Sequence, residues 1–213
     1  MRVQVIAIDH PVSTPLVDRC VESGARFGVE VAVYQGVMPH DNPRHIFQKN
    51  GIPTDRFVRN TMAKPDHCMA CFLSHRTLWQ RCVRDDEPTL ILEHDAVFTA
   101  EIPQLGDALV VNLGHPSYVP FTTPPTGLGP LVSRPAFPGA HAYFVSPLGA
   151  RKLLAKERQA KNPDMFLSVE RFPFLQEYYP WPVVAEDSVS TTQLERGCQA
   201  RMHKVVPFDI SKP

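Results

Sequence analysis

The hydrophobic pattern at the start of the chain most limits what it can fold into. Residues 3–8 alternate and are rich in β-branched side chains, and residues 14–28 repeat apolar side chains at helical spacing. Residues 29–34 then form a second apolar run. A strand, a helix and a strand in this order favour parallel strands joined by a crossover, with helices on the faces of the sheet. The pattern predicts an α/β fold with a mostly parallel central sheet flanked by helices.

The later segments continue this alternation. Apolar side chains at helical period predict a helix over residues 69–83 with Asp66 as its N-cap, and Pro88 lies beyond its end. Another helix is expected to start at Pro147, a residue suited to a first turn, and to reach residue 159. Further strands are expected over residues 89–92, 108–113 and 140–145.

Residues 115–138 break the alternation. This segment contains seven prolines and two glycines, so we expect it to lack regular secondary structure. A loop of this length inside a compact domain is commonly functional. We therefore expect it to cover a binding site.

Composition excludes several classes of protein. The chain has 213 residues, 43% of them hydrophobic, which predicts a single domain over residues 1–213. Its 22 basic and 22 acidic side chains balance, so no nucleic-acid partner is expected. No apolar stretch approaches the roughly 20 residues of a membrane-spanning helix, which leaves only peripheral membrane association. The five cysteines are an odd set, which favours a reducing compartment, and we expect a cytoplasmic protein.

Two of these cysteines offer a separate hypothesis. Cys68 and Cys71 have the CxxC spacing, and His67 and His75 lie nearby, a pattern compatible with a zinc or redox site. Because no second CxxC follows and cysteine is among the most buried residue types, we favour Cys71 as a core residue and Cys68 as a free thiol.

The strand expected at residues 89–92 runs directly into acidic residues. Glu93, His94 and Asp95 interrupt the apolar run of residues 90–98. Burying a charge costs several kcal/mol unless a partner or a metal holds it. Ligands of open α/β sheets bind outside the carboxyl ends of the strands, where these residues are expected to lie. The sequence therefore predicts a binding site at this turn, with Glu93 and Asp95 on one side if strand alternation persists.

Three blocks of sequence resemble glycosyltransferase family 25, the group of lipooligosaccharide galactosyltransferases and collagen glycosyltransferases. ACFLSH with LW at residues 70–79 is similar to the family's GCxLSHxxLW helix. ILEHDA at residues 91–96 is similar to its ILEDDV turn, and GAHAYFVS with GARKLL at residues 139–154 to its GxxAYxxSxxGAxKLL element. Pro163 and Asp164 match a PxD element loosely. The similarity covers about residues 66–193.

The resemblance implies a GT-A-like (Rossmann-like) domain that transfers a hexose from a nucleotide diphosphate sugar, with UDP-galactose or UDP-glucose expected as donor. The acceptor would be a glycan, such as a lipooligosaccharide in lipopolysaccharide biosynthesis, or another hydroxyl compound. Transfer in this family is expected to invert the anomeric carbon and to use Mn²⁺ or Mg²⁺. Hard cations of this kind prefer oxygen ligands, and acidic residues supply them.

The resemblance also implies roles for individual residues. Asp95 would bind the metal together with Glu93, and Asp164 would be the general base, although a helix N-cap is the alternative for Asp164. His94 replaces the family's middle aspartate and would contact the ribose, bind the metal or mark a lost activity. That last alternative predicts a catalytically degenerate module that binds nucleotide sugars.

Other aromatic and histidine residues are weaker candidates for the site. His75, His141 and Tyr143 are expected to border the donor, with packing in the core as the alternative. A sugar platform formed by Tyr178, Tyr179 and Trp181 is not favoured over a packed surface segment. A frayed terminus is the favoured interpretation of His203 and Lys204. The alternative is that they contact a metal or a phosphate near the carboxyl end of the chain.

Overall fold

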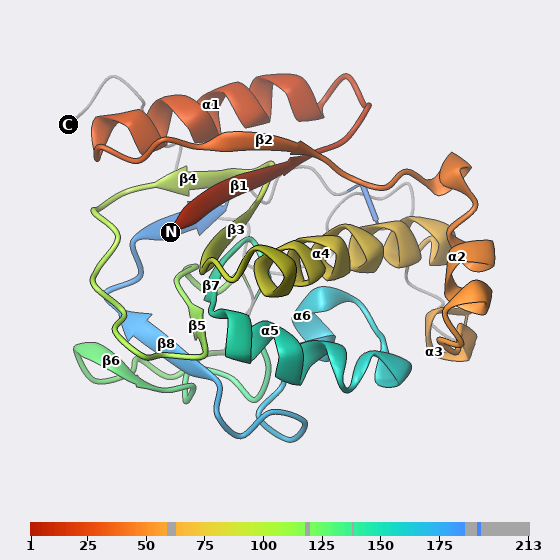
Figure 1. Cartoon of the computed structure of the whole chain (residues 1–213). Coiled ribbons are helices and arrows are strands. Elements are labelled where there is room, and N and C mark those ends of the chain that lie inside the picture. The colour runs from red at the N-terminus through yellow and green to blue at the C-terminus, as the bar shows by residue number, and fades with distance from the viewer. Residues whose placement is uncertain (59–62, 118–119, 138, 186–190, 193–213) are drawn as a thin grey trace.

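The computed structural model describes residues 1–58, 63–117, 120–137, 139–185 and 191–192 (Figure 1). In chain order, its elements are β1 (Arg2–Ala7), α1 (Ser13–Arg26), β2 (Ala32–Gln35), η1 (Pro39–Asp41), α2 (Pro43–Lys49), α3 (Asp55–Val58), α4 (Pro65–Asp85), β3 (Thr89–Glu93), β4 (Ala96–Phe98), β5 (Val110–Asn112), β6 (Gly127–Pro130), β7 (Ala142–Val145), α5 (Pro147–Leu154), η2 (Glu157–Gln159), α6 (Pro163–Phe166), β8 (Gln176–Tyr179) and β9 (Val183–Ala185). None of the described helices is long and apolar enough to cross a membrane.

Seven of the described strands form one central sheet in the order β2-β1-β3-β7-β5-β8-β6. β1 runs parallel to β2 and β3, and β5 runs parallel to β8. β7 is antiparallel to both β3 and β5, and β6 is antiparallel to β8. Five strands therefore point one way and two the other. The predicted α/β class with a mostly parallel sheet is confirmed.

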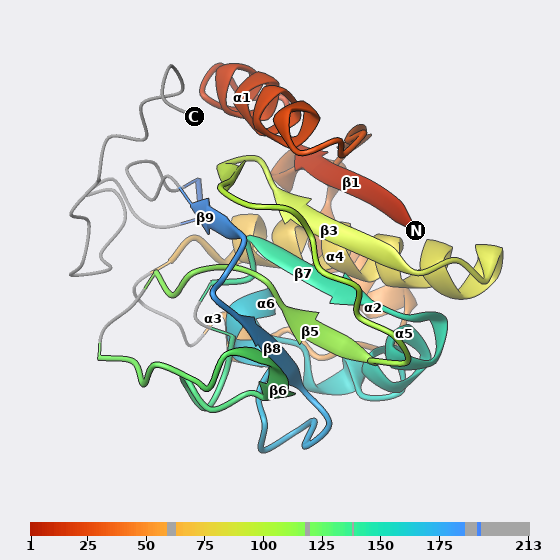
Figure 2. The same ribbon diagram turned by 90° about the vertical axis from the view of Figure 1, so that its left-hand side faces the viewer.

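Helices cover both faces of this sheet because its central strands are apolar on both sides. Leu90 and Leu92 of β3 pack with Val17 and Cys20 of α1, whereas Ile91 between them packs toward α4 and α5. Figure 2 shows β1, β3, β7, β5 and β8 side by side, with α4 behind them and α1 on the other side. Each residue of β3 thus faces either α1 or α4.

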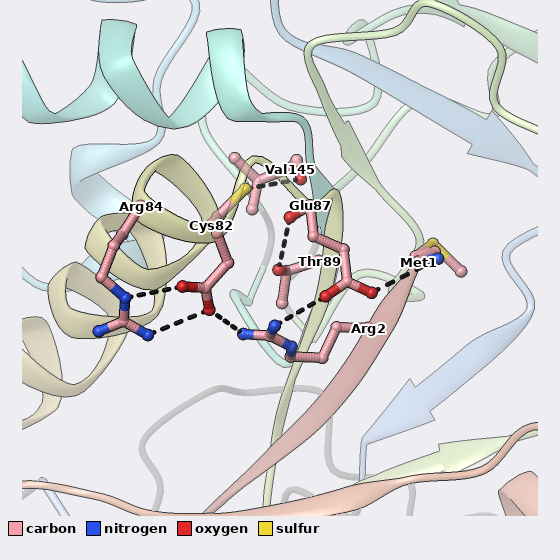
Figure 3. A network of polar contacts seen from close by, with 8 residues as sticks. Met1, Arg2, Cys82, Arg84, Glu87, Thr89 and Val145 are labelled. Carbon is pink, nitrogen blue, oxygen red and sulfur yellow. Dashed lines mark hydrogen bonds and ion pairs between the residues drawn. The ribbon is translucent and has the colours of Figure 1, made fainter.

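A polar network joins the amino ends of β1 and β3 to the end of α4 (Figure 3). Arg2 donates to Asp85 and Glu87 at 2.7 Å each, and Arg84 donates to Asp85 at 2.7 Å. Hydrogen bonds from Arg84 and Arg2 lower the pKa of Asp85 to about 2. The carboxyl ends of β1 and β3 lie at the opposite edge, so this network is remote from the predicted site.

Several expectations about local structure were wrong. The N-cap of α4 is Lys64, and Asp66 instead accepts a 2.7 Å hydrogen bond from Arg44 across the surface. The proline-rich segment contains β6, because only one of that strand's four residues is proline and the strand lies at the sheet edge. The structure also has elements that the pattern did not predict: α2, α3, β4, β8 and β9.

Candidate functional site

Glu93 ends β3 and faces α4, as alternation from Ile91 requires. The Nε2 atom of buried His75, from the middle of α4, lies 3.2 Å from Oε1 of Glu93. Burial opposes ionisation of Glu93, but the hydrogen bond and charge of His75 outweigh it and lower the pKa of the carboxyl group. Glu93 is therefore ionised, and the hydrogen bond with His75 fixes the orientation of its carboxylate.

A chain of hydrogen bonds continues from His75 into the core. The Nδ1 atom of His75 lies 2.8 Å from the hydroxyl of Tyr143, which accepts a 2.8 Å hydrogen bond from Nε1 of Trp79. Because an ionised carboxylate only accepts, Nε2 of His75 donates the hydrogen bond to Glu93. His75, Trp79 and Tyr143 are fully buried, a position that favours packing behind Glu93 over contact with a sugar nucleotide.

His94 points to the opposite side of the sheet. Its Nδ1 atom lies 3.0 Å from Oγ of Ser13, the first residue of α1, and this oxygen also accepts from the backbone N–H of Ile8. Burial lowers the pKa of His94, which keeps the ring neutral at pH 7. The residue that departs from the family pattern therefore ties the acidic turn to the start of α1.

Asp95 lies in the turn after β3 and is 8% exposed. Burial raises the pKa of the Cys20 thiol in α1 to about 12, and the negative charge of Asp95 adds to this increase. Because β3 ends at Glu93, strand alternation does not extend to Asp95. Burial raises the pKa of the Cys71 thiol of α4, the charges of Glu93 and Asp95 both add to this increase, and Asp95 also reaches Cys20 of α1.

Asp164 occupies the first turn of α6, and its Oδ1 atom accepts a 2.8 Å hydrogen bond from the backbone N–H of Met165. It is not the N-cap, which is Asn162. Burial raises the pKa of Asp164 to about 6, and the negative charge of Glu93 adds to this increase. Asp164 is therefore within electrostatic reach of Glu93, although the two residues are far apart in sequence.

His141 precedes β7 and is 3% exposed. Its carbonyl oxygen accepts a 2.9 Å hydrogen bond from the backbone N–H of Glu93. A Cβ atom on Gly114 would lie 2.3 Å from Nε2 of His141, so the ring needs a glycine at that position. Burial lowers the pKa of His141 to about 4, despite the opposing charge of Glu93. His141 is thus a neutral, packed ring that holds Glu93 through its main chain.

A cavity of about 640 Å³ opens beside this turn, at the carboxyl ends of β1 and β2. Asp9, Ser13 and Thr14 line one side, and Gln35 and Asp41 are among the residues that line the other. Val12, the N-cap of α1, provides no side-chain cap, and the first turn of this helix has no acidic residue. The positive end of the α1 dipole therefore has no side-chain cap, and the carboxylate of Asp9 lines the cavity at that end.

Sequence reasoning missed this cavity, although a signal was present. Asp9 and His10 follow the first strand just as Glu93 and Asp95 follow β3, and the same argument from strand ends applies to them. Ser13 carried no signal, because its contact with His94 depends on how α1 lies against the sheet.

Other predicted candidates lie elsewhere. Trp181 is buried, and its ring packs edge-on against His115, Phe121 and Tyr179 in an aromatic cluster. His203 and Lys204 lie outside the described residues.

The comparisons with known proteins agree with the sequence blocks. The family model described as glycosyltransferase family 25 (LPS biosynthesis protein) matches residues 22–117. This match covers less than half of the chain, and over this segment the chain is similar to glycosyltransferase family 25. The segment contains His75, Glu93, His94 and Asp95. The third block, at residues 139–154, lies outside it, so its similarity to the family stays a prediction.

Two solved structures are similar in shape at low identity. The glycosyltransferase GlyE of Streptococcus pneumoniae TIGR4 has a TM-score of 0.46 and 11% identity over 96% of this chain and 58% of GlyE. The apo form of mouse xyloside xylosyltransferase 1 has a TM-score of 0.45 and 9% identity over 81% of this chain and 82% of that protein. The chain thus spans less than two thirds of GlyE. No curated protein is significantly similar in sequence.

Proposed function

We propose that the protein is a glycosyltransferase that moves a hexose from a nucleotide diphosphate sugar, UDP-galactose or UDP-glucose, to a hydroxyl group of a glycan such as a lipooligosaccharide. The transfer depends on Mn²⁺ or Mg²⁺ and inverts the anomeric carbon. One observation carries the proposal. The three family-like blocks supply His75 and Trp79, Glu93, and Tyr143 to one chain of hydrogen bonds at the end of β3.

The cavity beside α1 is the proposed donor site. A nucleotide diphosphate is an anion, and the amino end of α1, which has no side-chain cap, presents the positive end of the helix dipole. Ser13 and Thr14 line the cavity at that end of the helix. His94 contacts Ser13, which lines this space, and this position behind the lining favours ribose or phosphate contact over metal binding.

The donor chemistry of the turn fits a hard divalent cation. Glu93 and Asp95 are carboxylates two positions apart, one at the end of β3 and one in the turn that follows, and His75 keeps Glu93 ionised. Asp95, in the turn after β3, is the main proposed ligand, with Glu93 as the second. A cation held there would neutralise charge on the departing diphosphate.

Asp164 is the proposed general base. A base works best when its pKa lies near the working pH, and the pKa of Asp164 is raised to about 6. It would accept the proton of the acceptor hydroxyl as that oxygen attacks the anomeric carbon. The ionised Glu93 favours this proton transfer, because its negative charge makes Asp164 more basic.

Asp95→Asn tests the proposed site, with Asp86→Asn as a matched control. Asp86 is the C-cap of α4 with φ of 49°, a conformation that asparagine tolerates, so the same chemical change is made far from the turn. A panel of nucleotide sugars is incubated with each protein, with and without Mn²⁺, and release of nucleoside diphosphate is measured. We expect Asp95→Asn to lose at least about 100-fold in rate. Equal rates in both variants would refute the assignment of Asp95.

The same panel tests the alternative of a degenerate binding module. Glu-His-Asp replaces the family's acidic triplet, and His94 is already bonded to Ser13. A nucleotide sugar that raises the melting temperature without release of nucleoside diphosphate, in the presence of acceptor glycans, would favour this second function.

A further inference from the structure

A second group of ligating side chains lies next to the proposed cation site. Among the residues that the structure describes, Cys71, His75 and Glu93 have ligand atoms that all lie within 4.8 Å of one another. Cys71 and His75 are four residues apart on α4 and therefore share a face of the helix. Glu93 reaches the same point from the end of β3.

These three ligand types select a different class of metal from the donor cation. Mn²⁺ and Mg²⁺ prefer oxygen atoms, whereas a thiolate and an imidazole suit zinc. A thiolate and a carboxylate together carry two negative charges, which balance the charge of Zn²⁺ in a half-buried site. Three protein ligands leave the fourth position of a tetrahedral zinc ion for water.

The spacing of His75 and Glu93 fits such an ion. Nε2 and Oε1 are 3.2 Å apart, longer than the roughly 2.7–2.9 Å of a strong charge-assisted hydrogen bond. Two ligands at about 2.0 Å from a tetrahedral ion lie about 3.3 Å apart. A zinc ion can thus replace the proton between these atoms with little movement of either side chain.

The surroundings of His75 also match those of a zinc ligand. Histidine ligands usually have their second ring nitrogen held by a hydrogen bond that fixes the ring. Nδ1 of His75 is held by Tyr143, and Trp79 holds the hydroxyl of Tyr143 in turn. With Nε2 bound to zinc, Nδ1 carries the proton and donates to Tyr143.

We propose that Cys71, His75 and Glu93 form a zinc site. Binding replaces the thiol proton of Cys71, which leaves to solvent, and no electrons are transferred. Cys68 is not part of the site, because its Sγ atom faces the carbonyl oxygen of Thr192 at 3.9 Å. The ligands are therefore not the CxxC pair of the sequence. Because Glu93 is shared, zinc bound here competes with the donor cation for this carboxylate.

Cobalt provides the direct test, because Co²⁺ bound to a thiolate absorbs strongly in the near ultraviolet. Co²⁺ is titrated into the wild-type protein, into Cys71→Ser and into the matched control Cys68→Ser, without any sugar nucleotide. We expect one thiolate-bound Co²⁺ per chain in the wild type and in Cys68→Ser, displaced by Zn²⁺. The absorption should be absent in Cys71→Ser.

Two further measurements keep the test decisive. Circular dichroism establishes that each variant is folded, and Glu93→Gln, which retains the thiol and the imidazole, should bind Co²⁺ at least tenfold more weakly. The same thiolate band in folded Cys71→Ser, or none in the folded wild type, would overturn the proposal. Neither result depends on whether the protein transfers sugars.

Discussion

Glu93 and Asp164 are two carboxylates whose pKa values are displaced in opposite directions. The hydrogen bond from His75 holds the pKa of Glu93 down against the effect of burial, whereas burial and the charge of Glu93 raise that of Asp164 to about 6. When the pKa values of two carboxyl groups are displaced in opposite directions, one group stays charged and the other can exchange a proton. In the proposed reaction, Glu93 stays ionised and Asp164 takes the proton.

The transfer rate is therefore expected to fall below about pH 6. Asp164 must be ionised to accept a proton, so kcat/KM should decrease about tenfold per pH unit once the pH is below the pKa of Asp164. Asp164→Asn should lower the rate by about 100-fold or more and remove this acid limb. The pH profile of both proteins checks the prediction, and an unchanged acid limb in Asp164→Asn would assign it to another group.

The raised pKa of Asp164 should also make the folded protein less stable as the pH increases, whereas the transfer rate increases. The pKa of Asp164 rises on folding from its ordinary value of 3.8 to about 6, so the folded state binds more protons between these values. Stability from this group is therefore lost as the pH rises from about 4 to about 6, and it does not return above that. Asparagine has no such loss. Asp164→Asn should melt higher than the wild type at pH 8, by roughly 2–4 °C, and equally at pH 4.

At the scale of elements, Tyr143 couples α4 and β7 behind the end of β3. Removal of its hydroxyl in Tyr143→Phe leaves Trp79 and His75 without their shared partner in the core, which should cost about 1–3 kcal/mol of stability. His75 is then free to turn away from Glu93. We expect kcat to fall by about tenfold, equal to about 1.4 kcal/mol, while the KM of the donor changes little.

Tyr34→Phe is the matched control for this prediction. Tyr34 is also buried on the α4 face of the sheet, but it lies in β2 and is not part of the hydrogen-bond chain. Steady-state kinetics and thermal melts on both variants separate the two effects. A purely structural role for Tyr143 would lower the melting temperature and leave kcat at the wild-type value.

The elements that the sequence predicted are those with a long or strong period. The helix over residues 69–83 lies within α4, and the strand over residues 89–92 lies within β3, because burial against a two-faced sheet imposes the repeat. β4, β6 and β9 have three or four residues each, too few to display a period. The contact of His75 with Glu93 follows from how α4 crosses the sheet, and no local pattern encodes it.

At the scale of the whole molecule, the central sheet has two halves that lie on either side of the proposed site. β2, β1 and β3 run parallel, and the cavity lies at the carboxyl ends of β1 and β2, as expected for the crevice of an open α/β sheet. β7 and β5 continue the sheet beyond β3, so both halves share one hydrogen-bonded ladder and both hydrophobic clusters. We therefore propose that residues 1–213 unfold as a single domain.

A ligand in the cavity should then stabilise the whole domain at once. With Mn²⁺ present, UDP at 100 times its Kd should add about 2.7 kcal/mol, or roughly 5–10 °C in melting temperature for a domain of this size. Calorimetry should show one transition that moves as a unit. Asp95→Asn should lose the part of this shift that depends on Mn²⁺, whereas Asp86→Asn should retain it. A single transition is expected because one half of a shared sheet cannot unfold without exposing both faces of the other half. Two transitions, of which UDP shifts only one, would instead show that the cavity belongs to a separately folding unit.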